Sequence, residues 1–109
     1  MSDQKTFTLD EARAMVPWLR EITKTAEQQI FETRKSVADP QQRHAALHRI
    51  IHHWAETVSK LGASPKQPFT VDFDNGTDFF CWEHPEESIY YRHGYHDGYK
   101  GRFRIEEES

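Results

Sequence analysis

The spacing of apolar side chains divides the chain into a helical first half and a strand-forming second half. Before Gly62 apolar residues recur every three to four positions, which is the period of an amphipathic helix, and after Pro68 they alternate with polar residues. We expect residues 9–61 to form a helical hairpin and residues 69–105 a strand-rich half. A length of 109 residues predicts one domain, 1–109, of the α+β class.

The first helix is predicted to begin at Leu9 and to end near Ala38. Thr8 and Glu11 have the spacing of a capping box, in which each side chain accepts a hydrogen bond from the backbone N–H of the other residue. An apolar stripe follows at near-helical spacing: Ala12, Val16, Leu19, Thr23, Ala26, Ile30 and Val37. Pro17 interrupts this pattern, and because proline lacks a backbone N–H we expect a kink there, or a short first helix and a restart.

The second helix is predicted to run from Pro40 to Leu61. Asp39 is a typical N-cap residue, Pro40 fits the first helical position, and Gly62 can end the helix. The apolar face of this helix consists of Leu47, Ile50, Ile51, Trp54, Val58 and Leu61. The connection between the two helices is very short, so they should form an antiparallel pair.

Two alternating segments, Phe69–Phe73 and Phe79–Glu83, flank the dipeptide Asn75-Gly76, which is typical of a tight β-hairpin. If this dipeptide forms a two-residue loop, Val71 pairs with Phe80. One face of the hairpin then carries Phe69, Val71, Phe73, Phe80 and Trp82. The other face carries Thr70, Asp72, Phe79, Cys81 and Glu83.

We expect the first of these faces to pack against the helical hairpin. Residues 89–93 are predicted to form a third strand. Gly94, Gly98 and Gly101 disfavour regular strand pairing after it, because glycine weakens a strand. The predicted architecture is therefore an antiparallel two-helix hairpin on a three-stranded antiparallel sheet.

Composition narrows the classes of function. Only 36% of the residues are hydrophobic and 29% are charged, so the core depends on 14 aromatic residues (seven Phe, four Tyr and three Trp) and a subunit interface would help. No apolar run reaches the length that crosses a bilayer. The net charge of -4 argues against nucleic-acid binding. A single cysteine, Cys81, excludes an internal disulfide, and we expect a cytoplasmic protein.

Histidines are frequent, and four of the seven lie in the predicted second helix. His44, His48 and His52 are spaced four apart, so neighbouring rings lie on one helix face and two of them can reach one divalent ion. The stretch from His48 to His52 has Arg49 where zinc proteases have their catalytic glutamate, which disfavours metal-assisted peptide hydrolysis. The alternative is that these residues are half-buried and hydrogen-bonded at the edge of the apolar face.

A second group of possible ligands lies in the C-terminal half. His93 and His96 are separated by a turn-forming glycine, and we predict that they lead a divalent-metal site of zinc, nickel or iron. The residues that could complete this site are His84, Asp97, and His48 or His52 of the second helix. The alternative is that these side chains satisfy local hydrogen bonds or line a subunit contact. A cysteine between two aromatic residues of a strand is expected to be an inert buried thiol.

Aromatic and basic residues alternate after residue 90, as they do at protein interfaces and at sites for phosphorylated ligands. This pattern supports a non-catalytic interaction module, which we expect to be a homodimer. A weaker hypothesis is a small-ligand enzyme with His93 as general base and Arg102 as anion clamp. Tyr91, Gly98 and Gly101 are the further candidates for an anion or ligand site.

Several short motifs resemble an uncharacterised prokaryotic family, domain of unknown function 2203. They are Phe7-Thr8-Leu9-Asp10-Glu11-Ala12, Val16-Pro17, Val71-Asp72-Phe73, Cys81-Trp82, and Tyr91-x-His93 leading into Gly98-x-x-Gly101-Arg102. The resemblance covers nearly the whole chain and implies no established activity. It gives weight to a family site at Asp72, Cys81, Trp82, His93, Gly98, Gly101 and Arg102. Family members commonly carry acidic residues just after the histidine, where this chain has Gly94 and His96, a departure that favours imidazole ligands.

Overall fold

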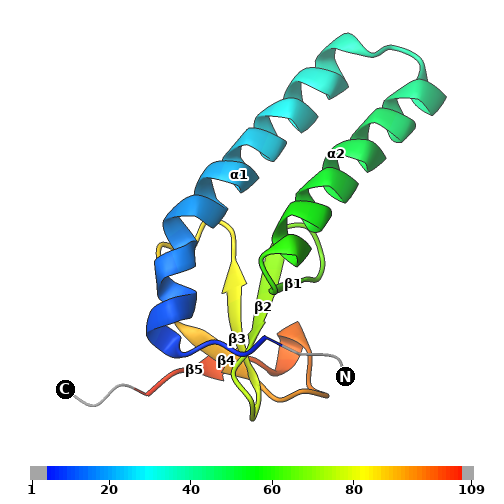
Figure 1. The fold of residues 1–109 in the computed structure, drawn as a ribbon. Helices are drawn as coiled ribbons and strands as arrows, with labels where there is room; N and C mark the ends of the chain where they lie inside the picture. Colours follow the sequence, from blue (N-terminus) through cyan, green and yellow to red (C-terminus); the bar gives the residue numbers. More distant parts are fainter. Residues whose placement is uncertain (1–4, 107–109) are drawn as a thin grey trace.

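The computed structural model describes residues 5–106 and has an α+β fold (Figure 1). Two helices come first and an antiparallel sheet follows. The helices are α1 (Leu9–Ser36) and α2 (Pro40–Lys60). The strands are β1 (Ser64–Pro65), β2 (Thr70–Asp74), β3 (Phe79–Glu83), β4 (Tyr91–His93) and β5 (Phe103–Arg104), and a short 3₁₀ helix, η1 (Tyr99–Gly101), precedes β5. Within residues 5–106 neither helix combines the length and apolar character needed to span a bilayer.

The predicted capping box at the start of α1 is confirmed. The backbone N–H of Thr8 donates to Oε1 of Glu11 at 2.8 Å, and the N–H of Glu11 donates to Oγ1 of Thr8 at 3.1 Å. The expected kink or restart at Pro17 is wrong, because α1 is one helix from Leu9 to Ser36. The Pro17 side chain is exposed, whereas Val16 and Leu19 are fully buried, so packing of the apolar stripe on both sides outweighs the missing hydrogen bond.

The second helix begins as the sequence predicts. Oδ2 of Asp39 accepts a hydrogen bond from the N–H of Gln42 at 2.8 Å, and Pro40 occupies the first turn. The helix ends at Lys60, and Gly62 follows with φ +91°, a backbone conformation that glycine adopts without steric cost. The two helices lie side by side and extend away from the sheet (Figure 1).

Five strands form the sheet in the order β1-β2-β3-β4-β5, and every neighbouring pair is antiparallel. The prediction of three strands is therefore wrong: β1 lies between the predicted second helix and the first predicted strand, and β5 follows the glycines expected to end regular pairing. Each additional strand has only two residues, too few to show an alternating pattern. β1 and β5 pair with backbone N–H and C=O groups that would otherwise be unpaired at the edges of β2 and β4.

The register of the central hairpin differs from the predicted one by two residues. Val71 lies opposite Trp82, and Phe73 lies opposite Phe80. The loop has four residues, 75–78, because Oδ1 of Asn75 accepts hydrogen bonds from the backbone N–H groups of Thr77 and Asp78, each at 2.9 Å. A shift of two preserves the alternation of side chains, so the predicted faces of the hairpin are confirmed.

The apolar face of the sheet packs against the helical hairpin. Its buried residues are Val71, Phe73, Phe80 and Trp82, which belong to one core cluster with Val16, Leu19, Trp54 and Val58 of the helices. Within the hairpin, Nε1 of Trp54 donates to Oγ1 of Thr23 at 2.9 Å, which satisfies both buried groups. The core therefore lies between the helices and one face of the sheet, and the opposite face is left for polar side chains.

Candidate functional site

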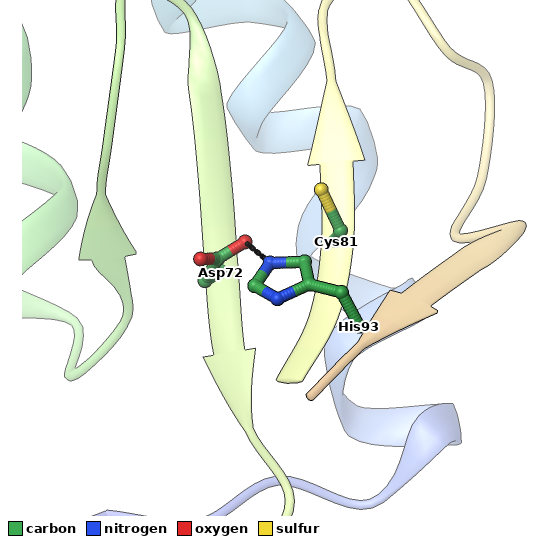
Figure 2. Close-up of side chains that lie close together, drawn as sticks. All are labelled: Asp72, Cys81 and His93. Carbon is green, nitrogen blue, oxygen red and sulfur yellow. Dashed lines mark hydrogen bonds and ion pairs between the residues drawn. The ribbon is translucent and has the colours of Figure 1, made fainter. Parts of the chain in front are cut away.

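Three side chains of types that can bind a metal ion lie together on the opposite face of the sheet (Figure 2). Asp72 of β2 is directly opposite Cys81 of β3, and His93 comes from β4. Each belongs to a different neighbouring strand, and the alternation of side chains directs all three away from the helices. Figure 2 shows the imidazole of His93 lying across β3 towards Asp72.

The cluster of Asp72, Cys81 and His93 is compact and almost completely buried. A carboxylate oxygen, the sulfur and a ring nitrogen of these residues all lie within 4.8 Å of one another. Nε2 of His93 is 3.0 Å from Oδ1 of Asp72, and the exposed fractions of Asp72, Cys81 and His93 are 3%, 0% and 2%. Buried groups of this kind are stable only when paired or bound to a ligand.

The hydrogen bonds of His93 define the role of each ring nitrogen. Nδ1 lies 2.9 Å from the backbone carbonyl oxygen of Gly94, which can only accept, so Nδ1–H donates to it. Nε2 therefore faces Asp72. A cation is needed between Nε2 and the carboxylate, and it can be a proton or a metal ion. Histidines that bind metals typically donate their second nitrogen to a carbonyl or carboxylate in this way.

The thiol of Cys81 is held in its protonated form. Burial raises the pKa of Cys81 to about 12, and the charge of Asp72 adds to this effect. The guanidinium of Arg102 opposes it from Nη1, which is 4.0 Å from the sulfur. The expectation of an unreactive thiol thus agrees with its surroundings, since a nucleophilic cysteine needs a lowered pKa. A metal ion could still replace the proton.

Arg102 closes one side of the cluster. Its guanidinium lies 4.0 Å from the ring centre of Tyr91 and 4.5 Å from that of Tyr99. Its two terminal nitrogens donate to the carboxylate of Glu86 at 3.3 and 3.1 Å. An anionic ligand at Arg102 would therefore compete with Glu86, so the predicted anion clamp would require this ion pair to open.

The local structure explains why glycine occupies three positions of the C-terminal segment. Gly98 has φ +63° and ψ -173°, a combination available almost only to glycine. A Cβ atom on Gly101 would lie 2.6 Å from Cβ of Asp97, and one on Gly94 would collide with the Asp97 carboxylate. The exposed Asp97 side chain thus lies against both Gly94 and Gly101. The turn that contains these residues carries Tyr95 and Tyr99 over the polar face.

A pocket of about 450 Å³ opens beside the cluster. Thr70, Asp72 and His93 are the buried residues of its lining, and Phe79, Tyr95 and Tyr99 are the aromatic ones. This volume lies within the range of sites that bind small molecules. Asp72 and His93 therefore border this pocket, and Cys81 lies behind them outside its lining.

The structure separates the ligands that the sequence suggested. His96 and Asp97 are exposed on the turn and lie outside the cluster of Asp72, Cys81 and His93. His84 lies on the helix side of the sheet, where Nε2 is 3.0 Å from Oε1 of Glu27 in α1.

The histidines of α2 are also distant from this cluster in the fold. His48 and His52 are exposed, with their rings stacked at 6.4 Å, and Nε2 of His52 is 2.6 Å from Oε1 of Glu56. Only His93 of the predicted ligands thus joins the buried group. Whether any of them binds a metal stays a prediction, as do self-association and location in the cell.

The predicted set of metal ligands did not include Asp72 and Cys81 as partners of His93. Two signals in the sequence pointed to them: the alternation that puts Asp72 and Cys81 on one face, and the family resemblance, which gave weight to both residues and to His93. The third strand was placed correctly around His93, but its register against β3 could not be read from the sequence.

Comparisons with known proteins place the chain in a family without identifying its activity. No curated protein and no solved structure matches it. A family profile matches residues 5–105, which is nearly the whole chain and includes every residue of the cluster. The chain belongs to the family described as uncharacterized conserved protein, DUF2203.

Proposed function

We propose that this protein binds a divalent transition metal, with zinc the best fit, through Asp72, Cys81 and His93. The observation that carries the proposal is the convergence of a carboxylate, a thiol and an imidazole within 4.8 Å on the buried polar face of the sheet. Zinc accepts all three ligand types, and a mixed set containing sulfur disfavours magnesium and calcium.

The geometry needs little change to hold the ion. Ligand atoms around tetrahedral zinc are about 3.3 to 3.7 Å apart, given bonds of about 2.0 to 2.3 Å. Nε2 of His93 and Oδ1 of Asp72 are already 3.0 Å apart, and the remaining separations are at most 4.8 Å. Rotation of the Cys81 side chain on a fixed strand supplies the closer approach. The ligands come from three paired strands, so the backbone is already in place.

The surroundings support a metal ion in place of protons. His93 donates Nδ1–H to the Gly94 carbonyl, which leaves Nε2 as the ligand atom. The positive charge of Arg102 near the sulfur would oppose a cation, but Glu86 neutralises it through two hydrogen bonds. Binding would release the proton of the Cys81 thiol, so the affinity should rise with pH.

Such a site fits a structural or regulatory role. It would tie together β2, β3 and β4, and a ligand selective for the folded state stabilises it. Three protein ligands leave one coordination position, which in zinc proteins is filled by water or by a substrate.

Metal analysis and cobalt substitution test the proposal. Protein purified without an affinity tag should contain one equivalent of metal, measured by inductively coupled plasma mass spectrometry. Cobalt(II) should give a sulfur-to-metal charge-transfer band that Cys81→Ser removes and that Asp72→Asn and His93→Gln weaken.

His96→Gln and the double variant His48→Gln/His52→Gln are matched controls, because these histidines are exposed and lie outside the cluster. They should retain the cobalt band and the metal. The proposal is wrong if the wild type binds no metal, or if only the control variants lose it. The latter result would favour the ligands suggested by sequence alone.

A further inference from the structure

We infer that the pocket beside the cluster binds a small planar ligand carrying one anionic group, as in an aromatic carboxylate; this rests on the proposed metal site. The pocket measures about 450 Å³ and has Asp72 and His93 in its lining. A metal held by these residues and Cys81 would have its remaining coordination position available to a ligand from the pocket.

The charges of the lining indicate an anion. The ionisable acidic and basic residues that line the pocket, apart from the tyrosines, are Lys66, Asp72 and His93. Nε2 of His93 lies 3.0 Å from Oδ1 of Asp72, so a proton or a metal ion held between them compensates the carboxylate charge. The Lys66 ammonium lies 5.7 Å from the ring centre of Phe79 and has no carboxylate partner among residues 5–106. Among the side chains that line the pocket, the charge left for a ligand is therefore positive, and the nearby carboxylates of Asp74 and Glu83 accept hydrogen bonds from Tyr95 and Tyr99.

Binding of the metal would not make the charge of the pocket negative. A divalent ion with an aspartate and a cysteine thiolate forms a centre of about zero net charge, and the histidine ligand is neutral. An anionic fourth ligand would bring the net charge of this centre to about minus one. The positive charge of Lys66 would offset this negative charge.

Three aromatic rings indicate a planar ligand. Phe79 and Tyr95 pack edge to face with ring centres 4.9 Å apart, and Tyr99 also lines the pocket. Tyr95 and Tyr99 are 42% and 39% exposed, which is high for large aromatic residues beside a buried polar cluster. The Arg102 guanidinium covers one face of Tyr99, at 4.5 Å from the ring centre, so a ligand would stack on the exposed part of Tyr95 and on the other face of Tyr99.

The tyrosines are also held in position before a ligand arrives. The hydroxyl of Tyr95 donates to Oδ1 of Asp74 at 2.7 Å, and that of Tyr99 donates to Oε1 of Glu83 at 2.9 Å. These hydrogen bonds fix both rings at their outer ends. A ligand would therefore lose little affinity to ordering of the pocket.

Benzoate is a suitable probe, because it combines one carboxylate with one aromatic ring. We would titrate benzoate into zinc-loaded protein and follow backbone amide shifts by NMR, with the cobalt protein giving a second readout from its visible spectrum. Benzoate should bind more tightly than acetate, which lacks the ring, and benzylamine, which has the opposite charge, should not bind.

Lys66→Met keeps the hydrocarbon stem and removes the charge, and it should weaken benzoate binding by about tenfold or more. Lys60→Met, at the exposed end of α2, is the control and should leave the affinity unchanged. Metal content is measured in every sample. If metal is bound but benzoate causes no shifts, or binds Lys66→Met equally well, the inference is wrong and the metal site stands. Absence of metal overturns the proposed function and this inference together.

Discussion

The two faces of the sheet are both buried, but they are stabilised by different interactions. The face towards the helices consists of apolar residues such as Phe73 and Trp82, which pack with the helical hairpin. The opposite face carries Thr70, Asp72, Cys81 and His93, which are 0 to 5% exposed. The C-terminal segment covers this polar face with Arg102 and the tyrosines.

The two faces place different requirements on the residues that form them. Burial of apolar area stabilises the helix side without directional requirements. On the polar side each buried group needs a specific partner, and an unpartnered group destabilises the fold.

The largest effect is expected from truncation on the apolar face. Trp82 is fully buried, and its Nε1–H donates to the backbone carbonyl of Glu86 at 2.8 Å. Trp82→Ala should lower the free energy of unfolding by about 3–5 kcal/mol, measured by urea denaturation. Phe31→Ala is the control, because Phe31 is 61% exposed and should contribute little. A loss of less than about 1 kcal/mol at Trp82 would show that the helix side does not dominate stability.

An intermediate effect is expected where the C-terminal segment covers the polar face. Arg102→Met would remove the two hydrogen bonds that Arg102 donates to the Glu86 carboxylate and should cost about 1–3 kcal/mol. It removes a charge that lowers the pKa of Cys81, but it also uncovers a fully buried sulfur, and because access limits the reaction Cys81 should react faster with a thiol reagent. Arg104→Met, with its exposed side chain, is the control. If both variants leave thiol reactivity unchanged, Arg102 does not protect the polar face.

The smallest effect concerns pH. Burial raises the pKa of Cys81 from an ordinary 9.0 to about 12, so the folded state keeps a proton that the unfolded state releases. This contribution is complete below pH 9 and is lost as pH rises towards 12. We compare metal-free wild type with metal-free Cys81→Ala between about pH 7 and 9.5. Over this range the free energy of unfolding should fall by roughly 1 kcal/mol more in the wild type than in the variant.

The tyrosines do not obscure this comparison. Hydrogen bonds to Asp74 and Glu83 raise the pKa values of Tyr95 and Tyr99 in the same direction, but both residues are present in the wild type and the variant. The difference between the two denaturation curves at each pH therefore reports on the thiol. Equal alkaline slopes would mean that the sulfur is not buried from water as described.

Local signals in the sequence predicted much of the fold. Thr8 and Glu11 marked the start of α1, and Asp39 and Pro40 marked the start of α2. Each of these start signals lies within a few consecutive residues, so it can be read from the sequence alone. The uninterrupted passage of α1 through Pro17 was not predicted, because it depends on burial along the whole helix.

The candidate site was predictable only in part. Alternation placed Asp72 and Cys81 on one face even though the predicted register was two residues away from the observed one. His93 was identified as a candidate, but with His96, which lies close in sequence and remains exposed. Proximity along the chain was a poor guide here, since the observed partners of His93 are 21 and 12 residues away.

The sequence by itself determined the helical hairpin, the two faces of the β-hairpin and the family, because capping, periodicity and short motifs are local properties. The tertiary structure decided the two edge strands, the continuity of α1 through Pro17 and the meeting of Asp72, Cys81 and His93. These features depend on pairing between distant segments, whose register is selected by the total burial and hydrogen bonding of the folded chain.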